Sequence, residues 1–347
     1  MDDFESEIPL SDNAFVIGVI YNLKKGIMSS IPDAEAEYDS IDTVHAIKVA
    51  LEKRGHRVVL LEADETLPEK LRQIHLDIAF NIAEGHNGRG REGQIPAILN
   101  FFNIPFTGSD ETTLCLALDK ALTKRLVSSC HIRTPKYALF NSENPYHPVS
   151  LKYPVILKPN AEGSSKGISD VSVVNTSREL RNLIKRNLYL YSGSMLAEEY
   201  IEGREFTVGL LGNGNEVRVF PPMEIIYKKG TQDKYHVYSY NVKQNYKEYV
   251  SYECPASLTR EKEAEMCNTA KKIFNILGCR DFSRIDFRMS EDGKIYFIEI
   301  NPLPGLAPGY SDYPMIAESS GICYTELVNG ILDAAIKRTG LKAGERS

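Results

Sequence analysis

The sequence predicts an α/β protein in which a parallel-sheet unit comes first and two mixed α+β lobes follow. Apolar, β-branched segments alternate with amphipathic helical segments over the first third, as in parallel sheets covered by helices. A glycine/serine-rich loop separates two strand-like segments in the middle of the chain, and two strongly alternating segments come near its end. The length of 347 residues allows two or three such units.

The first third contains the pattern of the parallel sheet. Ala14–Asn22 is an apolar run that predicts a strand, and Ser40–Arg54 carries apolar residues near helical spacing before Gly55 stops it. The other expected elements are strands at 56–64 and 76–84, a helix at 93–102 with Pro96 in its first turn, and a short strand with a loop at 104–109. The residues before Ala14 are expected to form a loose tail.

The rest of the chain is expected to form the two further lobes. A helix at Leu114–Ser129 precedes a hairpin, in which strands at 154–159 and 168–174 flank the glycine/serine loop 161–167. The tyrosine-rich stretch Tyr227–Tyr252 has little periodicity and is expected to be a long loop. The other expected elements are helices at 179–190, 259–277 and 324–337 and strands at 195–201, 205–211, 282–289 and 294–300.

Composition narrows the classes of function. The net charge is −6 and no basic run is present, which argues against a nucleic-acid partner. The six cysteines form no C-x-x-C pair, so a zinc cluster is not expected. The acidic start lacks the features of a signal peptide, and no apolar run approaches the roughly 20 residues of a membrane span. We therefore expect a cytoplasmic protein that acts on small molecules and has no membrane partner.

The sharpest functional signal is a polar group on the last two predicted strands. Arg284 and Asp286 share one face of the first strand, and Glu299 and Asn301 share one face of the second, because strand side chains alternate with a period of two. Facing strands would gather hard oxygen ligands of the kind that suit Mg²⁺, which bridges substrate phosphates. The competing interpretation is the solvated face of a hairpin. The apolar setting of Glu299 makes an unpaired carboxylate costly there.

A second signal is the run KPNAEGSSKG, which begins at Lys158. This lysine ends an apolar strand, and the loop after it offers backbone N–H groups and hydroxyls that can close over phosphates. The loop lacks the glycine order of a P-loop, and many glycine/serine hairpin tips are only turns. Alone, it supports a phosphate site and a plain turn equally.

A glycine pattern suggests a different function. Gly88, Gly90 and Gly93 form G-x-G-x-x-G between a strand and a helix, the context of a dinucleotide fingerprint. The pattern follows the third strand rather than the first, so Arg89, Arg91 and Glu92 favour a charged active-site loop instead.

Four further charged residues are expected at the surface when taken alone. Lys120 lies in an amphipathic helix, and Glu198, Glu199 and Glu205 surround a turn.

Together these motifs resemble the D-alanine–D-alanine ligase group of ATP-grasp enzymes, from about Phe15 to Ile336. The matching runs are FTGSDETTLCLALDKALTK, PVILKPNAEGSSKGISDV, EEYIEGREFTV, YECPA, GCRDFSRIDFRM and YFIEINPLPG. The resemblance implies an N-terminal Rossmann-like domain at 14–113, a central ATP-grasp lobe at 114–206 and a C-terminal ATP-grasp lobe at 207–340. It also implies that ATP lies between the two lobes.

The resemblance assigns the ATP and metal positions. ATP would be contacted by Lys120 and Lys158 and by Ser164 and Ser165 of the closing loop. The hinge residues Glu198, Glu199 and Ile201 would lie at the adenine, and Glu205 would hold the ribose. Ser165 would also take part in catalysis. Asp286, Glu299 and Asn301 would bind two Mg²⁺ ions, with Mn²⁺ as a substitute.

Catalytic and substrate residues are implied in the same way. Arg284 and the backbone N–H of Gly305 would stabilise the oxyanion of a tetrahedral intermediate, and Lys243 would lie on the transferring phosphate. Ser311 would bind a substrate carboxylate. Glu37 would hold the ammonium of the first substrate and so belongs with the catalytic residues. Proteins of this family often form homodimers through the N-terminal domain.

The sequence departs from the family at substrate contacts. YNLKKG follows the first strand in place of a glycine-serine signature, and either Glu84 or His86 could occupy the position of the family's histidine. Gln244 stands where the family has a tyrosine that helps define the second amino-acid pocket. The chemistry is therefore better supported than the substrate.

The predicted function is an ATP-dependent carbon–nitrogen ligase that joins an amino-acid carboxylate to an amine through an acyl phosphate. Its products are ADP, phosphate and a dipeptide, and its leading substrates are two D-alanines for peptidoglycan of the cell wall. The stretches Gly163–Gly167 and Tyr227–Tyr252 are expected to act as lids that exclude water. The alternatives are a ligase with another amino acid or amine, a nucleotide-binding module without ligation, and a dinucleotide oxidoreductase.

Overall fold

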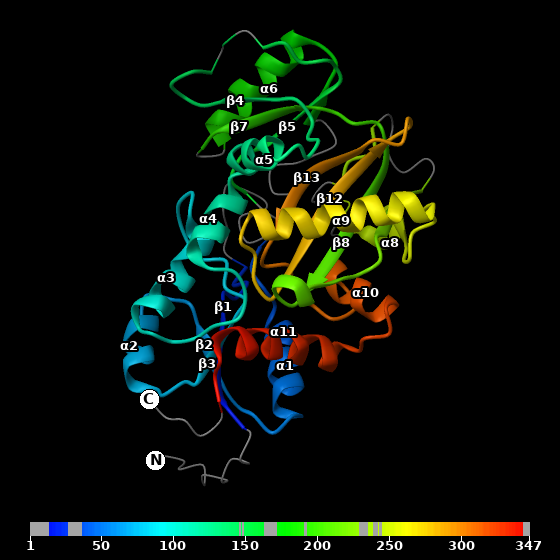
Figure 1. The fold of residues 1–347 in the computed structure, drawn as a ribbon. Coiled ribbons are helices and arrows are strands. Elements are labelled where there is room, and N and C mark those ends of the chain that lie inside the picture. Colours follow the sequence, from blue (N-terminus) through cyan, green and yellow to red (C-terminus); the bar gives the residue numbers. More distant parts are fainter. Residues whose placement is uncertain are drawn as a thin grey trace.

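The computed structural model describes residues 14–26, 37–145, 147, 149–162, 172–190, 193–228, 235–238, 242 and 245–342. In this part of the chain the strands form a three-stranded, a six-stranded and a four-stranded sheet, arranged one after another along the molecule (Figure 1). The expected α/β architecture is confirmed. Within these residues, no helix combines the length and apolar character needed to cross a membrane.

The N-terminal unit contains β1 (Val16–Tyr21), α1 (Ile41–Glu52), β2 (Arg57–Glu62), α2 (Leu67–Gln73), β3 (Ile78–Asn81), the 3₁₀ helix η1 (Arg91–Gly93) and α3 (Gln94–Phe101). Its strands pair in parallel in the order β2-β1-β3, and every residue of the central strand β1 is buried, as expected for a sheet covered on both faces. The Ser40 side chain accepts a hydrogen bond from Thr43 N and so caps α1. The predicted strands and helices as far as α3 are confirmed, whereas α2 was not predicted. The short strand predicted at 104–109 is wrong, because only an isolated bridge between Ala79 and Phe106 forms there.

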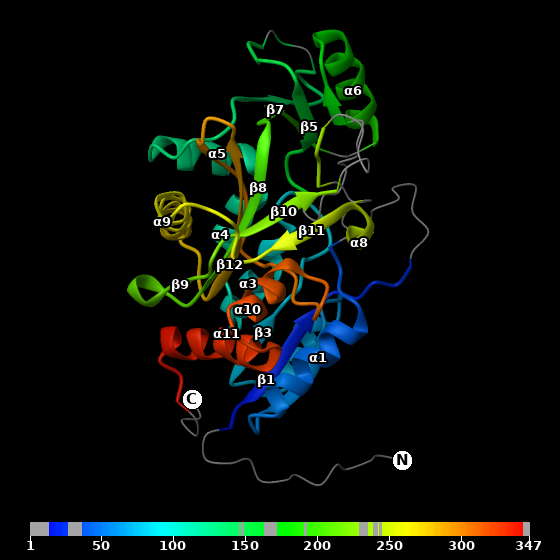
Figure 2. The same cartoon turned by 90° about the vertical axis from the view of Figure 1, so that its right-hand side faces the viewer.

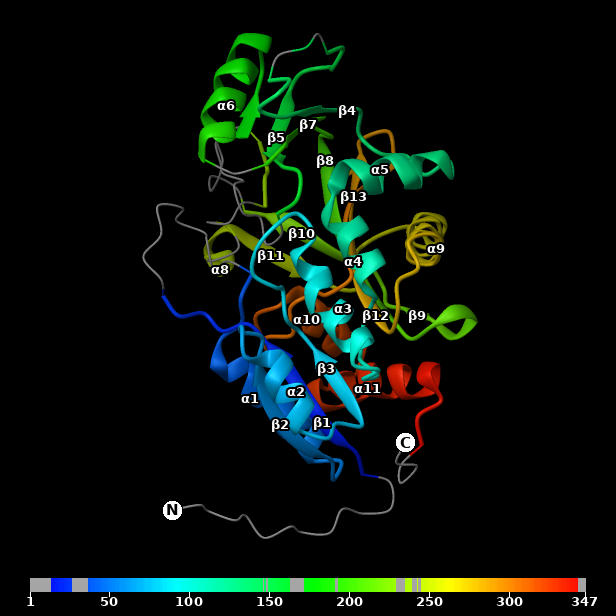
Figure 3. The ribbon, with the colours of Figure 1, turned by 90° about the vertical axis from the view of Figure 1, so that its left-hand side faces the viewer.

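The central unit contains α4 (Glu111–Leu118), α5 (Lys120–Ser129), β4 (Tyr137–Phe140), β5 (Val155–Pro159), β6 (Val173–Val174), α6 (Ser177–Leu190) and β7 (Met195–Glu199). The strands pair antiparallel in the order β4-β7-β5-β6, and β5 and β6 form the expected hairpin. Figure 3 shows α3, α4 and α5 in succession along one side of the molecule, from the N-terminal unit to this sheet.

The single helix predicted at Leu114–Ser129 is wrong. The helix breaks at Asp119, whose extended backbone (φ −82°, ψ 95°) ends α4 and whose side chain accepts a hydrogen bond from Leu122 N to cap α5. The N–H of the next residue donates to the carbonyl of Asn160 at 3.0 Å. The break therefore ties the start of α5 to the end of β5, a long-range contact that periodicity along the helix does not reveal.

The C-terminal unit contains β8 (Gly203–Leu211), the 3₁₀ helix η3 (Gly214–Glu216), β9 (Arg218–Val219), β10 (Met223–Tyr227), α8 (Tyr246–Tyr249), β11 (Val250–Glu253), α9 (Arg260–Ile276), β12 (Phe282–Ser290), β13 (Ile295–Asn301), α10 (Asp312–Ser319) and α11 (Tyr324–Thr339). The sheet order is β11-β10-β8-β12-β13, with β9 paired to β8. Figure 2 shows α9 on one side of β8 and β12, with β10, β11 and α8 on the other.

Two details of the C-terminal unit differ from the sequence-based expectation. The stretch Tyr227–Tyr252 is not a loop throughout, because its end contains α8 and the start of the edge strand β11. The neighbouring strands β7 and β8 lie in different sheets, and all of β8 belongs to the six-stranded one. The domain boundary expected between residues 206 and 207 therefore falls inside a strand.

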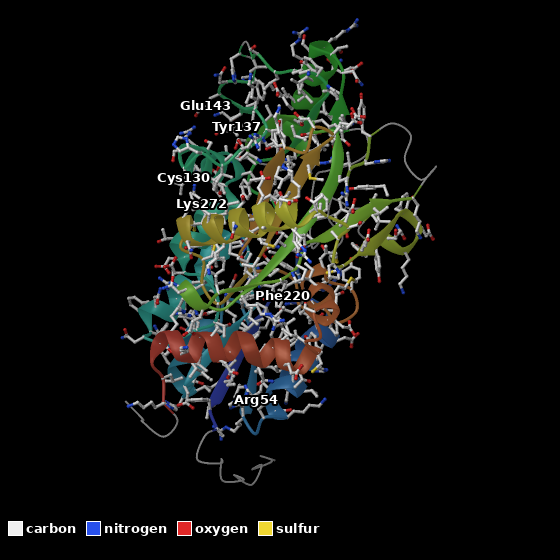
Figure 4. The ribbon with its side chains drawn as sticks, turned by 45° about the vertical axis from the view of Figure 1, so that its right-hand side comes forward. Arg54, Cys130, Tyr137, Glu143, Phe220 and Lys272 are labelled. Atoms are coloured by element: carbon white, nitrogen blue, oxygen red, sulfur yellow. The ribbon has the colours of Figure 1, made fainter. Side chains whose placement is uncertain are left out.

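Packing ties the three units together. One core cluster joins β1 and α1 to α10 and α11 and includes Ile17, Val44 and Ile331. The Asp281 side chain is fully buried and accepts hydrogen bonds from Arg338 of α11 and from the backbone N–H of Gly108. Between α9 and α5, the Lys272 Nζ donates to the carbonyl of Cys130 at 2.8 Å (Figure 4). These contacts hold the sheets in place around the cleft described next.

Candidate active site

A cleft of about 1360 Å³ lies between the four-stranded and six-stranded sheets. Residues of β5 and β7 line it on one side, and residues of β8, β10, β12 and β13 line it on the other. A side cavity of about 530 Å³ adjoins the cleft and shares five lining residues with it. These shared residues are Glu37, Glu84, Arg284, Asn301 and Asp312.

The polar group on the last two strands lies in this cleft. In the antiparallel pair β12–β13, Arg284 is opposite Asn301 and Asp286 is opposite Glu299. The next pair is Phe287 with Phe297, so the strand β13 bulges at residue 298. The sequence prediction that these four side chains share one site agrees with their placement, and the alternative of a solvated hairpin face does not.

Arg284 is held by two carboxylates. Its Nε and Nη2 lie 3.1 and 3.0 Å from the two oxygens of Asp286, and its Nη1 lies 3.3 Å from Asp312 Oδ2. Burial opposes a charged guanidinium, but these two carboxylates raise the pKa of Arg284 above its ordinary value. A permanent positive charge therefore faces both the cleft and the side cavity.

Two lysines bring positive charge to the opposite wall of the cleft. The Nζ atoms of Lys120 and Lys158 lie 3.7 and 3.9 Å from Glu299 Oε2. Burial acts to raise the pKa of Glu299, but these lysines and Arg284 outweigh it and lower the pKa to about 2. An ionised carboxylate and two ammonium groups are a suitable setting for polyphosphate and a divalent cation.

A buried chain of charges supports that wall. Lys124, with no exposed surface, lies 2.8 Å from Glu198 Oε1, and Lys158 lies 3.0 Å from the other oxygen of Glu198. The Lys124 Nζ also donates to the carbonyl of Ile298 at 2.5 Å, at the bulge of β13. The surface positions expected for Lys120 and Glu198 from the sequence alone are wrong, because both side chains are buried at the junction of three elements.

Another polar group lies at the end of the cleft near β8 and β10. Tyr227 Oη donates to Glu205 Oε2 at 2.9 Å, and Arg288 Nη2 lies 3.8 Å from the same oxygen. The Arg288 guanidinium lies 4.7 Å from the ring centroid of Tyr200. Burial raises the pKa of Glu205, although Arg288 acts against it. Ile201 also lines this end.

Glu199 has a mixed position. It is among the residues that line the cleft, and its Oε1 accepts a hydrogen bond from Lys152 N at 2.8 Å. The surface position expected from the sequence therefore fits Glu199 better than it fits the buried Glu198.

The side cavity contains the residues expected at the oxyanion and the substrate carboxylate. Gly305 and Ser311 both line it, and a Cβ atom on Gly305 would come within 2.9 Å of Ser311 Oγ. Ser311 Oγ accepts a hydrogen bond from Ala307 N at 3.2 Å. In the described part of the chain, the Gly305 N–H has no hydrogen-bond acceptor. A donor of this kind is available to a developing oxyanion.

Of the two residues that could take the histidine's place, only Glu84 enters the cavities. It lines both of them. His86 instead bonds to the carbonyl of Ala63 at 2.5 Å and contacts Tyr38 edge-on. Gly85 between them has φ +73°, and a Cβ there would collide with the carbonyl of Arg91. This turn directs Glu84 inward and His86 away.

The glycine-rich loop supplies a buried arginine rather than a dinucleotide cradle. Arg91 forms two bonds with Glu37, from Nη2 at 2.5 Å and from Nε at 3.2 Å. Its Nη1 donates to the carbonyl of Ala161 at 2.9 Å. Cβ atoms on Gly90 and Gly93 would come within 2.9 and 2.6 Å of a sulfur of α4, so close packing accounts for these two glycines.

Comparison with known proteins identifies the family. A family model described as the D-Ala D-Ala ligase C-terminus matches residues 126–333, which is more than half of the chain. The chain belongs to the D-alanine–D-alanine ligase family. It is 34% identical over 296 residues to the D-alanine–D-alanine ligase of Aquifex aeolicus, covering 84% of this chain and 94% of that protein. It is also 34% identical to the ligase of Carboxydothermus hydrogenoformans, covering 89% and 97% of the two chains.

Solved structures show the same fold. The D-alanine–D-alanine ligase of Bacillus anthracis, crystallised with ATP, superposes with a TM-score of 0.73 at 21% identity and covers 94% of this chain and 99% of that one. The VanG D-Ala:D-Ser ligase of Enterococcus faecalis gives a TM-score of 0.71 at 22% identity, with coverage of 93% and 99%. The expected ATP-grasp fold with an N-terminal parallel-sheet domain is confirmed.

Four residues expected in the site of this D-alanine–D-alanine ligase family member lie outside the described residues. They are Ser164, Ser165, Lys243 and Gln244. Their expected roles at the phosphates and in the second amino-acid pocket stay predictions.

The donor set of the family's metal position fits Mg²⁺. Among the described residues no three His, Cys, Asp or Glu side chains gather as a metal site. Asp286, Glu299 and Asn301 instead offer two carboxylates and an amide, a small oxygen set that suits an ion completed by water and substrate phosphates. Arg284 occupies both oxygens of Asp286, so a cation bound there would share that carboxylate with the guanidinium.

Several functional candidates were missed by the sequence reasoning. Lys124, Arg288 and Asp312 are all buried within ion pairs at the cleft or the side cavity. Arg288 had a usable signal, because it continues the polar face of Arg284 and Asp286 along β12. The others depend on partners far away in the sequence.

Proposed function

We propose that this member of the family is an ATP-dependent ligase that joins the carboxylate of one amino acid to the amine of another, with D-alanine as the leading substrate for both positions. The observation that carries this proposal is the convergence of Lys120, Lys158 and Arg284 on the carboxylates of Asp286 and Glu299 in a single cleft. A pure nucleotide binder has no need of an arginine that faces a second cavity beside the phosphates.

The first step is transfer of the ATP γ-phosphoryl group to the substrate carboxylate. Lys120 and Lys158 neutralise charge on the phosphates, and Glu205 and Tyr227, whose O–H donates to Glu205, provide acceptors for the ribose hydroxyls. Glu198, which Lys124 and Lys158 fix in position, borders the nucleotide. When bound, Mg²⁺ supplies charge neutralisation and orientation of the phosphates, held by Asp286, Glu299 and Asn301.

The second step is attack of an amine on the acyl phosphate, with release of phosphate. Arg284 and Gly305 both line the side cavity, where the guanidinium and the Gly305 N–H stabilise the oxyanion of the tetrahedral intermediate. Ser311 Oγ accepts from Ala307 N, which leaves its O–H free to donate to the carboxylate of the second amino acid. The resulting products are ADP, phosphate and a dipeptide.

The chain's own departures favour a second candidate within the same chemistry, a ligase for another amino-acid pair. The specific observation is that Glu84, a carboxylate and one of the two residues that could take the place of the family's histidine, lines both cavities. Assembly as a homodimer through the N-terminal unit is also part of the proposal and rests on the family resemblance.

The test is phosphate release from ATP and Mg²⁺ across a panel of D- and L-amino acids, singly and in pairs, with the product mass measured. Phosphate release with D-alanine and a product of the mass of its dipeptide would support the proposal in full. Release with another pair would keep the ligase and reject D-alanine. Nucleotide binding without amino-acid-stimulated release under any condition would reject the ligase.

A further inference from the structure

The carboxylate expected to bind the first substrate's ammonium, Glu37, is already engaged. Both of its oxygens bond to Arg91, and only 6% of its side chain is exposed. A bidentate pair of this kind is among the stronger charge-assisted contacts in proteins. To reach a substrate, Glu37 would have to release a buried arginine that has few other acceptors.

Arg91 also connects two units of the molecule. Its Nη1 donates to the carbonyl of Ala161, and its Nη2 lies 3.3 Å from Glu162 Oε2, in the segment that follows β5. The carbonyl of Glu162 in turn accepts a hydrogen bond of 2.5 Å from Lys120 Nζ. Glu37 and Arg91 together therefore join the N-terminal unit to the wall of the cleft that carries Lys120.

Two other carboxylates in the same region have no such partner. Glu84 lines both the cleft and the side cavity, and Glu92 lines the cleft with only 7% of its surface exposed. Within the described chain, neither side chain has a hydrogen bond or an ion pair. The turn that carries Glu84 is fixed, because Gly85 N donates to Asn22 Oδ1 at 2.9 Å and Tyr38 Oη donates to the Gly85 carbonyl.

Burial and mutual repulsion leave these two carboxyl groups in need of a cation. Burial raises the pKa of Glu84 well above its ordinary value, and Glu92 and Glu37 raise it further. The pKa of Glu92 is raised to about 8 by burial and by Glu37, which together outweigh the opposing effect of Arg91 and Lys120. An ammonium group bound between them would offset both effects.

We propose that Glu84 and Glu92 form the subsite that binds the ammonium group of the first amino-acid substrate, while Glu37 acts through Arg91 as a positioning residue between the two units. This inference rests on the proposed ligase function. It assigns recognition of the substrate amine to a carboxylate at the position of the family's histidine.

Binding of the first substrate to matched variants tests the subsite. The variants are Glu84→Gln, the double variant Glu37→Gln/Arg91→Gln, which removes both charges of that pair, and the control Glu69→Gln on the exposed surface of α2. The probe is D-alanine, or the amino acid that gives most phosphate release if D-alanine gives none. Its affinity is measured by calorimetry in the presence of a non-hydrolysable ATP analogue and Mg²⁺, beside the affinity for the analogue alone.

We expect Glu84→Gln to weaken amino-acid binding at least 10-fold, to leave affinity for the ATP analogue within about 3-fold, and to reduce the preference for D-alanine over D-lactate, which lacks the ammonium. In the unmodified protein, amino-acid affinity should rise with pH as the two carboxyl groups ionise, and Glu84→Gln should flatten that rise. The double variant should keep amino-acid affinity better than Glu84→Gln does, and Glu69→Gln should match the unmodified protein.

The opposite pattern would overturn the inference. If the double variant loses amino-acid binding while Glu84→Gln keeps it, Glu37 is the ammonium ligand. If Glu84→Gln fails to fold, judged by thermal unfolding and analogue binding, Glu84→Asp and Glu92→Gln replace it, and unchanged amino-acid affinity in both rejects the subsite. Failure of the proposed function looks different, because the unmodified protein would then show no amino-acid-stimulated phosphate release at all.

Discussion

Replacement of Lys124 by methionine tests whether the buried charge chain supports the cleft. Lys124 is fully buried, lies 2.8 Å from Glu198 and donates to the carbonyl of Ile298. Methionine keeps most of the side-chain volume but leaves Glu198, itself 2% exposed, with Lys158 as its remaining cation. Removal of one partner from a buried ion pair costs roughly 3–5 kcal/mol, and the retained lysine places the expected loss near 3 kcal/mol.

Urea unfolding of the nucleotide-free protein measures this loss. With a slope of about 3 kcal/mol/M, the midpoint should fall by about 1 M. The control is Lys70→Met, which removes an exposed pair with Asp64 and should cost at most about 1 kcal/mol. In a double-mutant cycle, Lys124→Met and Glu198→Gln should be non-additive by at least about 1 kcal/mol. A midpoint change no larger than that of the control would show that the buried pair of Lys124 and Glu198 does not stabilise the cleft.

Three further results are expected. Glu299→Gln should reduce turnover at least about 100-fold in a protein that still folds but has a lower unfolding midpoint, since it removes an ionised carboxylate that faces Lys120 and Lys158; retained turnover, measured as phosphate release, would contradict the metal assignment. Gly85→Ala should destabilise the protein more than Gly88→Ala, because both glycines have positive φ but only the first has a backbone carbonyl in the way; equal losses in thermal unfolding would count against that packing. Burial raises the pKa of Glu92 to about 8, so the folded protein is most stable below the ordinary pKa of glutamate and loses stability as the pH rises toward 8. Glu92→Gln should therefore stabilise the ligand-free protein by roughly 1–3 kcal/mol at pH 8 and by less at pH 5. An effect of the same size at both pH values would contradict the raised pKa.

The sequence predicted the parts of the site that depend on local order. The period of two along β12 and β13 placed Arg284 and Asp286 on one face and Glu299 and Asn301 on another, and strand pairing then brought the faces together. The alternation survives the bulge at Ile298, because the bulge lies beyond Glu299 on the side away from Asn301.

What the sequence did not predict depends on contacts between distant segments. Lys124 and Lys120 share one helix with the spacing of an exposed face, and only the packing of α5 on β13 and β5 buries them. Arg91 has the sequence context of a flexible glycine loop, yet its partner is more than 50 residues away. The choice between Glu84 and His86 depended on the backbone of Gly85, whose positive φ the sequence permits but does not require.

The most direct test of the ligase activity is release of phosphate from ATP by the unmodified protein with Mg²⁺ and amino acids, followed by the mass of the product. A ligase gives phosphate release that requires an amino acid, equimolar ADP, and a product whose mass is the sum of two amino acids less one water. ATP binding with no amino-acid-dependent phosphate release across the whole panel would contradict the ligase activity.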